Sequence, residues 1–351
     1  MNLNELLEQA IQEKASDVFI VAGLPVSFRK NGQIHRINSE KLLPAQTEEL
    51  LKSIYEFAGN RDLSFLDQEG DDDFSFAIKG LSRFRVSAYK QRGTLSAVIR
   101  IITFELPDFQ ELGIPEHVIH LGDVGKGMIL VTGPAGSGKS TTLAAIINQI
   151  NHNQQKHIIT LEDPLEYLHR HDQCIVSQRE MSVDTKSYVA ALRAALRQSP
   201  DVILLGEMRD YETIAVAMTA AETGHLLLST LHTIGAANTI DRIIDVFPAN
   251  QQRQIAVQLS MVLTAVISQQ LVPTVDDRVV PALEIMTVTP AIRNMIRENK
   301  VHQIDGIIYS SMKDEMISMD SSLLNLYKRG TISRDTALKY ATNPDMLSKK
   351  L

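Results

Sequence analysis

Several features that define other protein classes are missing from this chain of 351 residues. It has one cysteine, Cys174, which excludes an intramolecular disulfide framework and a Cys₄ zinc site within one chain. We interpret Cys174 as a small buried hydrophobic residue. No uninterrupted run of about 18 apolar residues occurs, so a membrane-spanning helix is not expected.

Excess basic charge is also absent. Residues 1–10 carry acids and no basic side chain, unlike a secretory signal, so we expect a cytoplasmic protein. The formal net charge is −7, which argues against nucleic acid as the main partner, although an acidic total is compatible with a local basic groove or pore. The length predicts one or two domains with ample chain for a core.

One motif dominates the sequence. Residues 133–141 read GPAGSGKST and meet the GxxxxGK[ST] spacing of a phosphate-binding P-loop, between a hydrophobic run at 128–131 and a helix-forming run at 141–150. The glycines let backbone N–H groups wrap phosphates, Lys139 reaches the β- and γ-phosphates, and Ser140 ligates Mg²⁺. The sequence therefore predicts binding of ATP or a related triphosphate with Mg²⁺. The residues expected to bind it are Gly133, Pro134, Ala135, Gly136, Ser137, Gly138, Lys139, Ser140 and Thr141.

The N-terminal part has the pattern of a small α+β domain. Apolar residues at helical spacing cover 3–11 and 44–58, and strand-like runs cover 18–22, 26–30, 33–37, 73–78, 83–89 and 95–102. Asn31-Gly32 between two of these runs predicts a hairpin. Pro107, Gly113 and Pro115 give residues 103–115 the composition of a linker. We therefore expect an N-terminal domain at 1–102, a linker at 103–115 and a second domain at 116–351.

The second domain alternates short apolar strands with helices, as parallel α/β folds do. Strands are predicted at 128–131, 157–161, 202–205 and 226–229, and helices at 186–197 and 211–222. This order predicts a RecA-like core. Beyond it, Ile255, Leu259, Val262, Val266 and Leu271 predict one long amphipathic helix with a glutamine-rich outer face. Smaller helices are expected to complete the C-terminus.

Acidic residues follow two of the predicted strands. Glu162, Asp163 and Glu166 follow the strand at 157–161, and Glu207 follows the strand at 202–205. Ligands of an open α/β sheet lie at the carboxyl ends of its strands, so these acids are expected to face the phosphates, one acting on the attacking water and one supporting Mg²⁺. Two of the four could instead cap helices or form surface pairs, and for Glu162 both readings stay open. Gly206 stands where a Walker B motif often has Asp, which leaves direct Mg²⁺ ligation by Glu207 open.

Two histidines flank the predicted strand at 226–229. His225 precedes the strand and His232 follows it. A lone histidine is more often structural than catalytic. His232 lies at the carboxyl end of its strand, where it could sense the γ-phosphate by hydrogen bonding, so it is the stronger candidate.

Four ordered motifs together resemble the bacterial type II/IV secretion and type IV pilus ATPase superfamily. They are GPAGSGKST, TLEDPLEY (the Asp box), LLGEMRD (an atypical Walker B motif) and GHLLLSTLHT (the His box). GEMRD together with AIRNMIRE at 291–298 is similar to the PilT family of retraction ATPases. The resemblance covers the chain and implies an α/β fold with a small PAS-like α+β N-terminal domain, a RecA-like P-loop ATPase core and C-terminal helices.

The resemblance also implies roles for individual residues. Glu166 would be the catalytic glutamate and Glu207 the glutamate that supports Mg²⁺. The γ-phosphate and conformational roles would fall to His225, His232 and Arg242, and Arg85 and Arg100 would act as arginine fingers. Taken alone, these two arginines would be read as solvated strand residues.

Within AIRNMIRE, helical spacing would make Ile292, Met295 and Ile296 core residues. Arg293 and Arg297 lie on another face and are expected to contact a partner.

The activity implied is that of a homohexameric Mg²⁺-dependent ATPase that drives pilus retraction from the inner face of the cytoplasmic membrane. Its partners would be the inner-membrane pilus platform protein and a paralogous retraction ATPase. An accessory ATPase of the PilU kind and another secretion-system ATPase are the alternatives within the superfamily. Two other classes stay open: a nucleotide-gated binding module without sustained turnover, and a DNA translocase, which the acidic balance disfavours.

Overall fold

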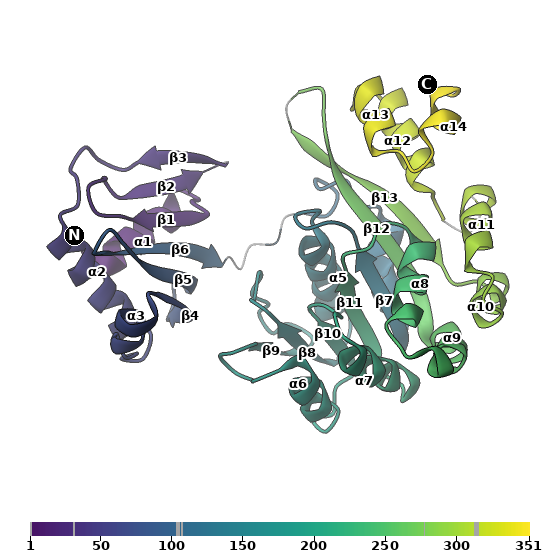
Figure 1. Ribbon diagram of the computed structural model, residues 1–351, viewed down its shortest axis with the longest axis horizontal. Coiled ribbons are helices and arrows are strands. Elements are labelled where there is room, and N and C mark those ends of the chain that lie inside the picture. The colour runs from purple at the N-terminus through teal and green to yellow at the C-terminus, as the bar shows by residue number, and fades with distance from the viewer. Residues whose placement is uncertain (1, 31, 103–105, 107, 277, 312–315) are drawn as a thin grey trace. The chain divides into compact units, whose positions relative to one another are not determined.

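The structure is a computed structural model that describes residues 2–30, 32–102, 106, 108–276, 278–311 and 316–351. The chain forms two compact units (Figure 1). The N-terminal unit contains residues 1–105 together with Glu166–Leu168, and the C-terminal unit contains the rest. The observed class is the expected one, a small α+β unit followed by a parallel α/β unit with C-terminal helices. Among the described residues, no helix has the length and apolar character needed to cross a membrane.

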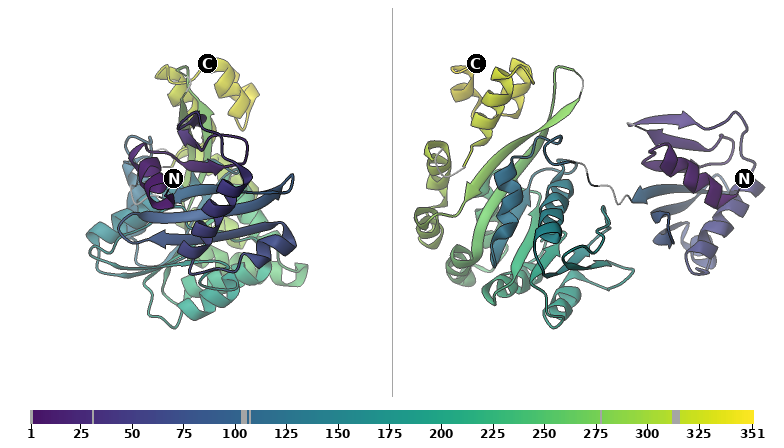
Figure 2. Two further views of the ribbon diagram at one scale, coloured as in Figure 1. Left: turned by 90° about the vertical axis from the view of Figure 1, so that its left-hand side faces the viewer. Right: turned by 180° about the vertical axis from the view of Figure 1, so that it is seen from behind.

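In the N-terminal unit, an antiparallel six-stranded sheet has the order β3-β2-β1-β6-β5-β4. α1 and α2 lie on the same face of this sheet (Figure 1, Figure 2). The unit contains α1 (Leu3–Gln12), β1 (Asp17–Ile20), β2 (Ser27–Lys30), β3 (Gln33–Arg36), α2 (Pro44–Phe57), α3 (Ser64–Glu69), β4 (Asp71–Ile78), β5 (Ser82–Gln91) and β6 (Thr94–Ile102).

Period-two alternation explains how this sheet buries one face. On β5, Phe84, Val86 and Ala88 are buried in the core beneath the helices, and the residues between them point to the other face. The predicted hairpin is present, because Lys30 at the end of β2 pairs with Gln33 at the start of β3. Asn31, which was expected in its turn, lies outside the described residues.

In the C-terminal unit, the sheet has seven strands in the order β13-β12-β7-β11-β10-β8-β9. Neighbouring strands from β12 to β9 are parallel, and β13 is antiparallel to β12. The strands are β7 (Gly127–Thr132), β8 (His157–Glu162), β9 (Ile175–Glu180), β10 (Val202–Leu205), β11 (Leu226–Leu231), β12 (Leu263–Pro273) and β13 (Val279–Thr287).

Helices cover both faces of this sheet. One face packs against α5 and the short segments before β7, and the other packs against α6 to α11. α12, α13 and α14 gather near the far end of the β12–β13 hairpin (Figure 1). The helices are α4 (Glu116–Ile119), η1 (His120–Asp123), α5 (Lys139–Asn153), α6 (Tyr188–Ala195), α7 (Tyr211–Glu222), α8 (Ala236–Asp245), α9 (Ala249–Val262), α10 (Pro290–Arg297), η2 (Val301–Gln303), α11 (Ile304–Ser310), α12 (Met319–Lys328), α13 (Arg334–Tyr340) and α14 (Pro344–Ser348).

The prediction of one long amphipathic helix from Ile255 to Leu271 is wrong in its second half. α9 ends at Val262, and the chain turns directly into β12, which pairs with β7 on one side and β13 on the other. Val266, expected on the apolar stripe of a helix, is instead buried within this strand. The backbone partners that the edge of β7 offers to this segment override its helical periodicity.

The expected linker is only partly described, because residues 103–105 and 107 lie outside the described residues. Its later part belongs to a core: Phe109, Leu112 and Ile114 pack against the face of the C-terminal sheet that α5 covers.

A buried carboxylate joins β4, α2 and the segment between α2 and α3 in the N-terminal unit. The carboxylate of Asp72 on β4 accepts hydrogen bonds from the hydroxyl of Tyr55 (2.9 Å) and from Nε and Nη2 of Arg61 (2.8 and 2.7 Å). Burial acts to raise the pKa of Asp72, but the hydrogen bonds from Arg61 and Tyr55 outweigh it and lower the pKa. The ionised form is therefore the one that stabilises the unit.

We predict that Asp72→Asn destabilises the N-terminal unit by about 2 kcal/mol at pH 7, because charge-assisted hydrogen bonds are lost. The pKa of Asp72 is lower in the folded state than in the unfolded state, where it is about 3.9, so ionised Asp72 stabilises the fold above that pH. This stabilisation is lost as the pH falls through the folded-state pKa. The difference in melting temperature between the variant and the wild type should therefore shrink from pH 7 to pH 3. Asp73→Asn, at an exposed position of the same strand, is the control. Equal melting of wild type and Asp72→Asn at pH 7 would contradict this account.

Candidate active site

The P-loop joins β7 to α5. All of β7 is buried, the loop occupies residues 133–138, and α5 begins at Lys139. Gly133 has a φ of 140°, and a Cβ at this position would overlap the backbone carbonyl oxygen of Gln269. Gly138 has a φ of 85° and is also close to Gln269. Backbone conformation therefore requires glycine at both positions, and at Gly133 the backbone of Gln269 also leaves no space for a side chain.

The side chains of the loop divide between a buried side and an open side. Lys139 is buried, and its Nζ donates to the carbonyl oxygens of Gly133 (3.0 Å) and Pro134 (2.9 Å). The residues from Pro134 to Gly136 are exposed, whereas Ser140 and Thr141 are half-buried in the first turn of α5. The helix N-terminus and the loop thus present an accessible rim suited to an anion.

Parallel pairing places the ends of four strands at the same edge of the sheet. β11 pairs in register with β7 and β10, and β10 pairs with β8. The P-loop and His232 directly follow β7 and β11, Glu207 comes two residues after β10, and Glu162 is the last residue of β8. All of them therefore lie at the carboxyl edge. Glu166 is exposed four residues beyond Glu162, within the short stretch that belongs to the N-terminal unit.

Glu207 is the centre of a polar cluster at this edge. Its side chain is 13% exposed, and Oε2 lies 2.6 Å from Nε of Arg209 and 3.4 Å from Nε2 of His232. The structure thus brings together Glu207 and His232, each of which the sequence places near the carboxyl end of a strand. The hydrogen bond to Glu207 raises the pKa of the Arg209 guanidinium. The sequence analysis does not single out Arg209, although it lies two residues after Glu207 in GEMRD. The last residue of that motif, Asp210, has a separate role: its side chain caps α7 by accepting from the N–H of Thr213 (2.8 Å).

The glycine of the atypical Walker B motif has a spatial explanation. A Cβ on Gly206 would lie 3.0 Å from the Tyr188 hydroxyl oxygen, 3.3 Å from the carbonyl oxygen of Leu161 and 3.4 Å from Cα of Glu162. An Asp would not fit here without displacing Tyr188 or the end of β8. Tyr188 on α6 is a second residue that the sequence did not indicate. Burial, followed by the nearby Glu207, Asp163 and Glu162, raises its pKa, so the phenol stays protonated at neutral pH.

His225 lies at the opposite edge of the sheet from the P-loop within one chain. Its carbonyl oxygen accepts from the N–H of Gly127 at the start of β7 (3.1 Å), and its Nδ1 lies 2.9 Å from the carbonyl oxygen of Ala220 in α7. Its contacts within the chain therefore tie the end of α7 to the starts of β11 and β7. Arg242 is exposed on α8.

Arg85 and Arg100 lie side by side in the N-terminal unit. They are directly paired across β5 and β6, on the face of the sheet opposite its buried core. Nε of Arg100 lies 3.0 Å from Oδ1 of Asp17, and the Arg100 side chain remains 63% exposed. Both guanidinium groups thus belong to one polar face.

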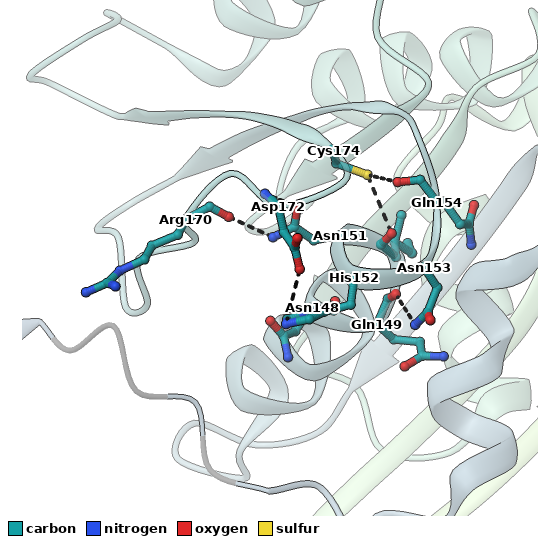
Figure 3. Close-up of polar contacts among 10 residues, drawn as sticks. Asn148, Gln149, Asn151, His152, Asn153, Gln154, Arg170, Asp172 and Cys174 are labelled. Carbon is teal, nitrogen blue, oxygen red and sulfur yellow. Dashed lines mark hydrogen bonds and ion pairs between the residues drawn. The ribbon is translucent and has the colours of Figure 1, made fainter.

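The chain that follows the Asp box returns to the end of α5 (Figure 3). Asn151, which is buried, donates through Nδ2 to the carbonyl oxygen of Arg170 (2.7 Å) and accepts from the N–H of Asp172 (3.3 Å). Cys174 donates through Sγ to the carbonyl oxygen of Gln154 (2.9 Å), and burial raises its pKa. The lone cysteine is buried, as expected. These contacts anchor both the P-loop helix and the segment after the Asp box.

Arg293 is hydrogen-bonded within the chain, and its expected contact with a partner stays a prediction. It donates through Nη1 to the carbonyl oxygens of Ser260 (2.6 Å) and Met261 (2.9 Å), near the end of α9. Ile292 and Ile296 on the same helix are buried, as their spacing predicts. Arg297 is exposed, with Nη2 on the side-chain oxygen of Asn294 (2.8 Å).

A family model described as "Type II/IV secretion system protein" matches residues 1–309. The type IV pilus retraction ATPase PilT of Pseudomonas aeruginosa is 44% identical over 98% of this chain and 99% of its own length. A twitching motility protein of Neisseria gonorrhoeae is 42% identical over 99% of this chain and 92% of its own length. A crystal structure of the pilus retraction motor PilT with bound ADP is 43% identical with a TM-score of 0.91, and the match covers 99% of both chains.

We predict that Gly206→Ala lowers stability by about 1–3 kcal/mol, because the added methyl group is forced against Tyr188 and the end of β8. Adding Tyr188→Phe should restore part of the loss, since the hydroxyl oxygen is the nearest obstacle. Gly306→Ala in α11, where a Cβ meets open space, is the control and should be neutral or slightly stabilising. Melting temperatures measure all of these variants. If Gly206→Ala melts no lower than Gly306→Ala, the spatial explanation is wrong.

Proposed function

The chain belongs to the type II/IV secretion system protein family, and we propose that it is the ATPase motor of type IV pilus retraction. Its substrate is ATP, and the work that it performs is the withdrawal of pilin from the fibre. The observation that carries the proposal is the carboxyl edge of the C-terminal sheet, where a complete P-loop stands at the same edge as the Glu207–His232 pair. An anion-binding loop beside a carboxylate and a histidine has the parts that phosphoryl transfer to water needs.

In the proposed reaction, backbone N–H groups of residues 133–138 hold the phosphates and Lys139 reaches the β- and γ-oxygens. To do so, its ammonium group exchanges the carbonyl oxygens of Gly133 and Pro134 for phosphate oxygens. Glu166 orients a water whose oxygen attacks the γ-phosphorus, and the bond to the β,γ-bridging oxygen breaks to release ADP and phosphate. His232 senses the γ-phosphate by hydrogen bonding and transmits its presence to Glu207, its neighbour in the polar cluster.

The roles of three arginines and one histidine are proposed from the family resemblance. Arg85 and Arg100 are proposed as arginine fingers, and their pairing on a polar face supports this role because two guanidinium groups can act together on the γ-phosphoryl. His225 and Arg242 are proposed to act in conformational change. The contacts of His225 with α7 and β7 support a role in transmitting movement rather than in contacting phosphate.

The nucleoside of ATP is proposed to occupy a cavity of about 380 Å³ beside the P-loop. Gly138, Thr141 and Thr142 form its wall toward the phosphates. The rest of its lining is mainly apolar, including Leu112, Ile114, Leu271, Val280 and Pro281. A flat base suits such an apolar wall, and the ribose would lie toward the loop.

Mg²⁺ is proposed as the cofactor, with Ser140 as its ligand and Glu207 as its support. Among the described residues, no group of three or more His, Cys, Asp or Glu side chains is placed to hold a metal alone. Ser140, half-buried in the first turn of α5, is suitably placed to bind an ion whose coordination phosphate oxygens would complete. When bound, Mg²⁺ neutralises charge that develops between the β- and γ-phosphates.

We predict that ATP hydrolysis by the purified chain stops when a chelator removes Mg²⁺ and returns when Mg²⁺ is added back. Ser140→Ala should raise the Mg²⁺ concentration needed for half-maximal rate, because one oxygen ligand is lost. Phosphate release measures both effects, with Ser199→Ala outside the proposed site as the control. An unchanged rate in the chelator would contradict the Mg²⁺ proposal.

Further parts of the proposal concern assembly. We propose a homohexamer at the inner face of the cytoplasmic membrane that acts on the pilus platform protein, alongside a paralogous retraction ATPase. A curated relative named as the type IV pilus ATPase PilU is 39% identical over 99% of this chain, so an accessory retraction ATPase is the second candidate.

The cell-level test is a count of surface pili on cells that lack this chain. Complementation with the wild type should remove an excess of non-retracting pili, and complementation with Lys139→Ala should not, because the variant loses the phosphate-binding ammonium group. Electron microscopy of equal cell numbers gives the count, and immunoblotting confirms equal levels of the two forms.

The other outcomes point to other members of the superfamily. Cells without pili would contradict retraction and indicate a motor for extension. Unchanged pili would indicate the accessory ATPase or a different secretion system.

A further inference from the structure

The side chain of Gln269 lies directly beneath the P-loop. It belongs to β12, the strand beside β7, and it is 3% exposed. Its Nε2 donates to the carbonyl oxygen of Ser137 (2.6 Å), and its Oε1 accepts from the hydroxyl of Thr142 (2.8 Å). One amide thus joins the P-loop to the first turns of α5.

The orientation of this amide follows from its partners. The carbonyl oxygen of Ser137 can only accept a hydrogen bond, so it requires the NH₂ group. The hydroxyl of Thr142 can donate, and it satisfies the amide oxygen. Glutamate would offer no donor to Ser137 when ionised, and leucine would offer neither group.

The glycines at the two ends of the loop pack against the same residue. A Cβ on Gly133 would overlap the backbone oxygen of Gln269, and a Cβ on Gly138 would lie 2.8 Å from its Nε2. The loop therefore touches Gln269 at its start, near its end and at the carbonyl group of Ser137. This arrangement fixes the curvature on which the N–H groups of a phosphate cradle depend.

We propose that Gln269 is a positioning residue that holds the P-loop in its phosphate-binding curvature and thereby sets the affinity for nucleotide. The inference rests on the proposed function, because it assumes that the loop binds ATP and ADP. Gln269 also lines the cavity proposed for the nucleoside, but both ends of its amide are hydrogen-bonded to the loop and α5. It acts through Ser137, Thr142 and the two glycines.

The adjacent residue provides a matched control. Gln270 is the same amino acid on the same strand, but its Nε2 donates to the carbonyl oxygen of Tyr340 (3.3 Å) at the end of α13, and its side chain is only half-buried. A change at Gln270 removes a glutamine hydrogen bond from β12 without touching the P-loop.

The experiment measures ADP affinity by titration calorimetry on the full chain, together with kcat and KM for ATP. Gln269→Leu should weaken ADP binding about tenfold or more, because buried partners in the loop lose their hydrogen bonds. The same variant should raise KM more than it lowers kcat, whereas Gln270→Leu should bind ADP as the wild type does. Melting temperatures establish that each variant is folded.

A second variant keeps the proposal testable if Gln269→Leu does not fold. In Gln269→Glu, the ionised carboxylate opposes the Ser137 carbonyl and the bound phosphates, and burial raises the pKa of such a carboxyl. On protonation, the new O–H can donate to Ser137 while the other oxygen accepts from Thr142. The ADP affinity of this variant, relative to the wild type at the same pH, should therefore recover as the pH falls from 8 to 5.5.

The outcomes separate the two proposals. If the wild type binds no nucleotide, the proposed function fails and this inference fails with it. If the wild type binds ADP and both Gln269 variants bind it equally well at every pH, only the positioning role is wrong. A loss in Gln269→Leu equal to that in Gln270→Leu would also overturn it.

Discussion

Parallel pairing of β7, β11, β10 and β8 is the constraint on which the site depends. Because these strands run in one direction and pair in register, every segment that leaves a carboxyl end arrives at the same edge. The P-loop, His232 and Glu207 meet there although they are far apart in sequence. The same constraint puts His225 at the other edge, where its contacts with α7 and Gly127 belong to the framework of the sheet.

β12 and β13 connect this edge to the rest of the C-terminal unit. Ser268 accepts from the N–H of Gly235 (2.8 Å), and the buried carboxylate of Glu284 accepts from Ala236 (2.8 Å) and Met319 (3.4 Å). One pair of strands therefore supports the P-loop through Gln269, the segment after His232 and the first residue of α12. These contacts connect the C-terminal helices to the site, because a displacement of α12 would act on β13 and β12, which also hold the P-loop.

Sequence reasoning predicted the parts of the fold in which local pattern and tertiary environment agree. β7, β8, β10 and β11 are short apolar runs that end in polar motifs, and their residues were expected at one edge of a parallel sheet. The order of the strands and the contact between Glu207 and His232 come from the structure. β12 was missed because the apolar spacing from Ile255 to Leu271 was interpreted as a helix, while the free edge of β7 exists only in the folded chain. Gln269 and Ser137 are 132 residues apart, and Tyr188 is recognisable only through its closeness to Gly206. Such contacts leave no periodic signal.

The most direct measurement is ATP turnover by the purified chain, compared with Glu166→Gln and with Glu212→Gln at an exposed position on α7. We predict that wild type and Glu212→Gln hydrolyse ATP. Glu166→Gln should still bind ATP but turn over at least about 100-fold more slowly, because the group that orients the attacking water is lost. Turnover of Glu166→Gln at the wild-type rate would contradict the proposed mechanism. A wild type that binds ATP without turnover would contradict the motor and indicate a nucleotide-gated binding module.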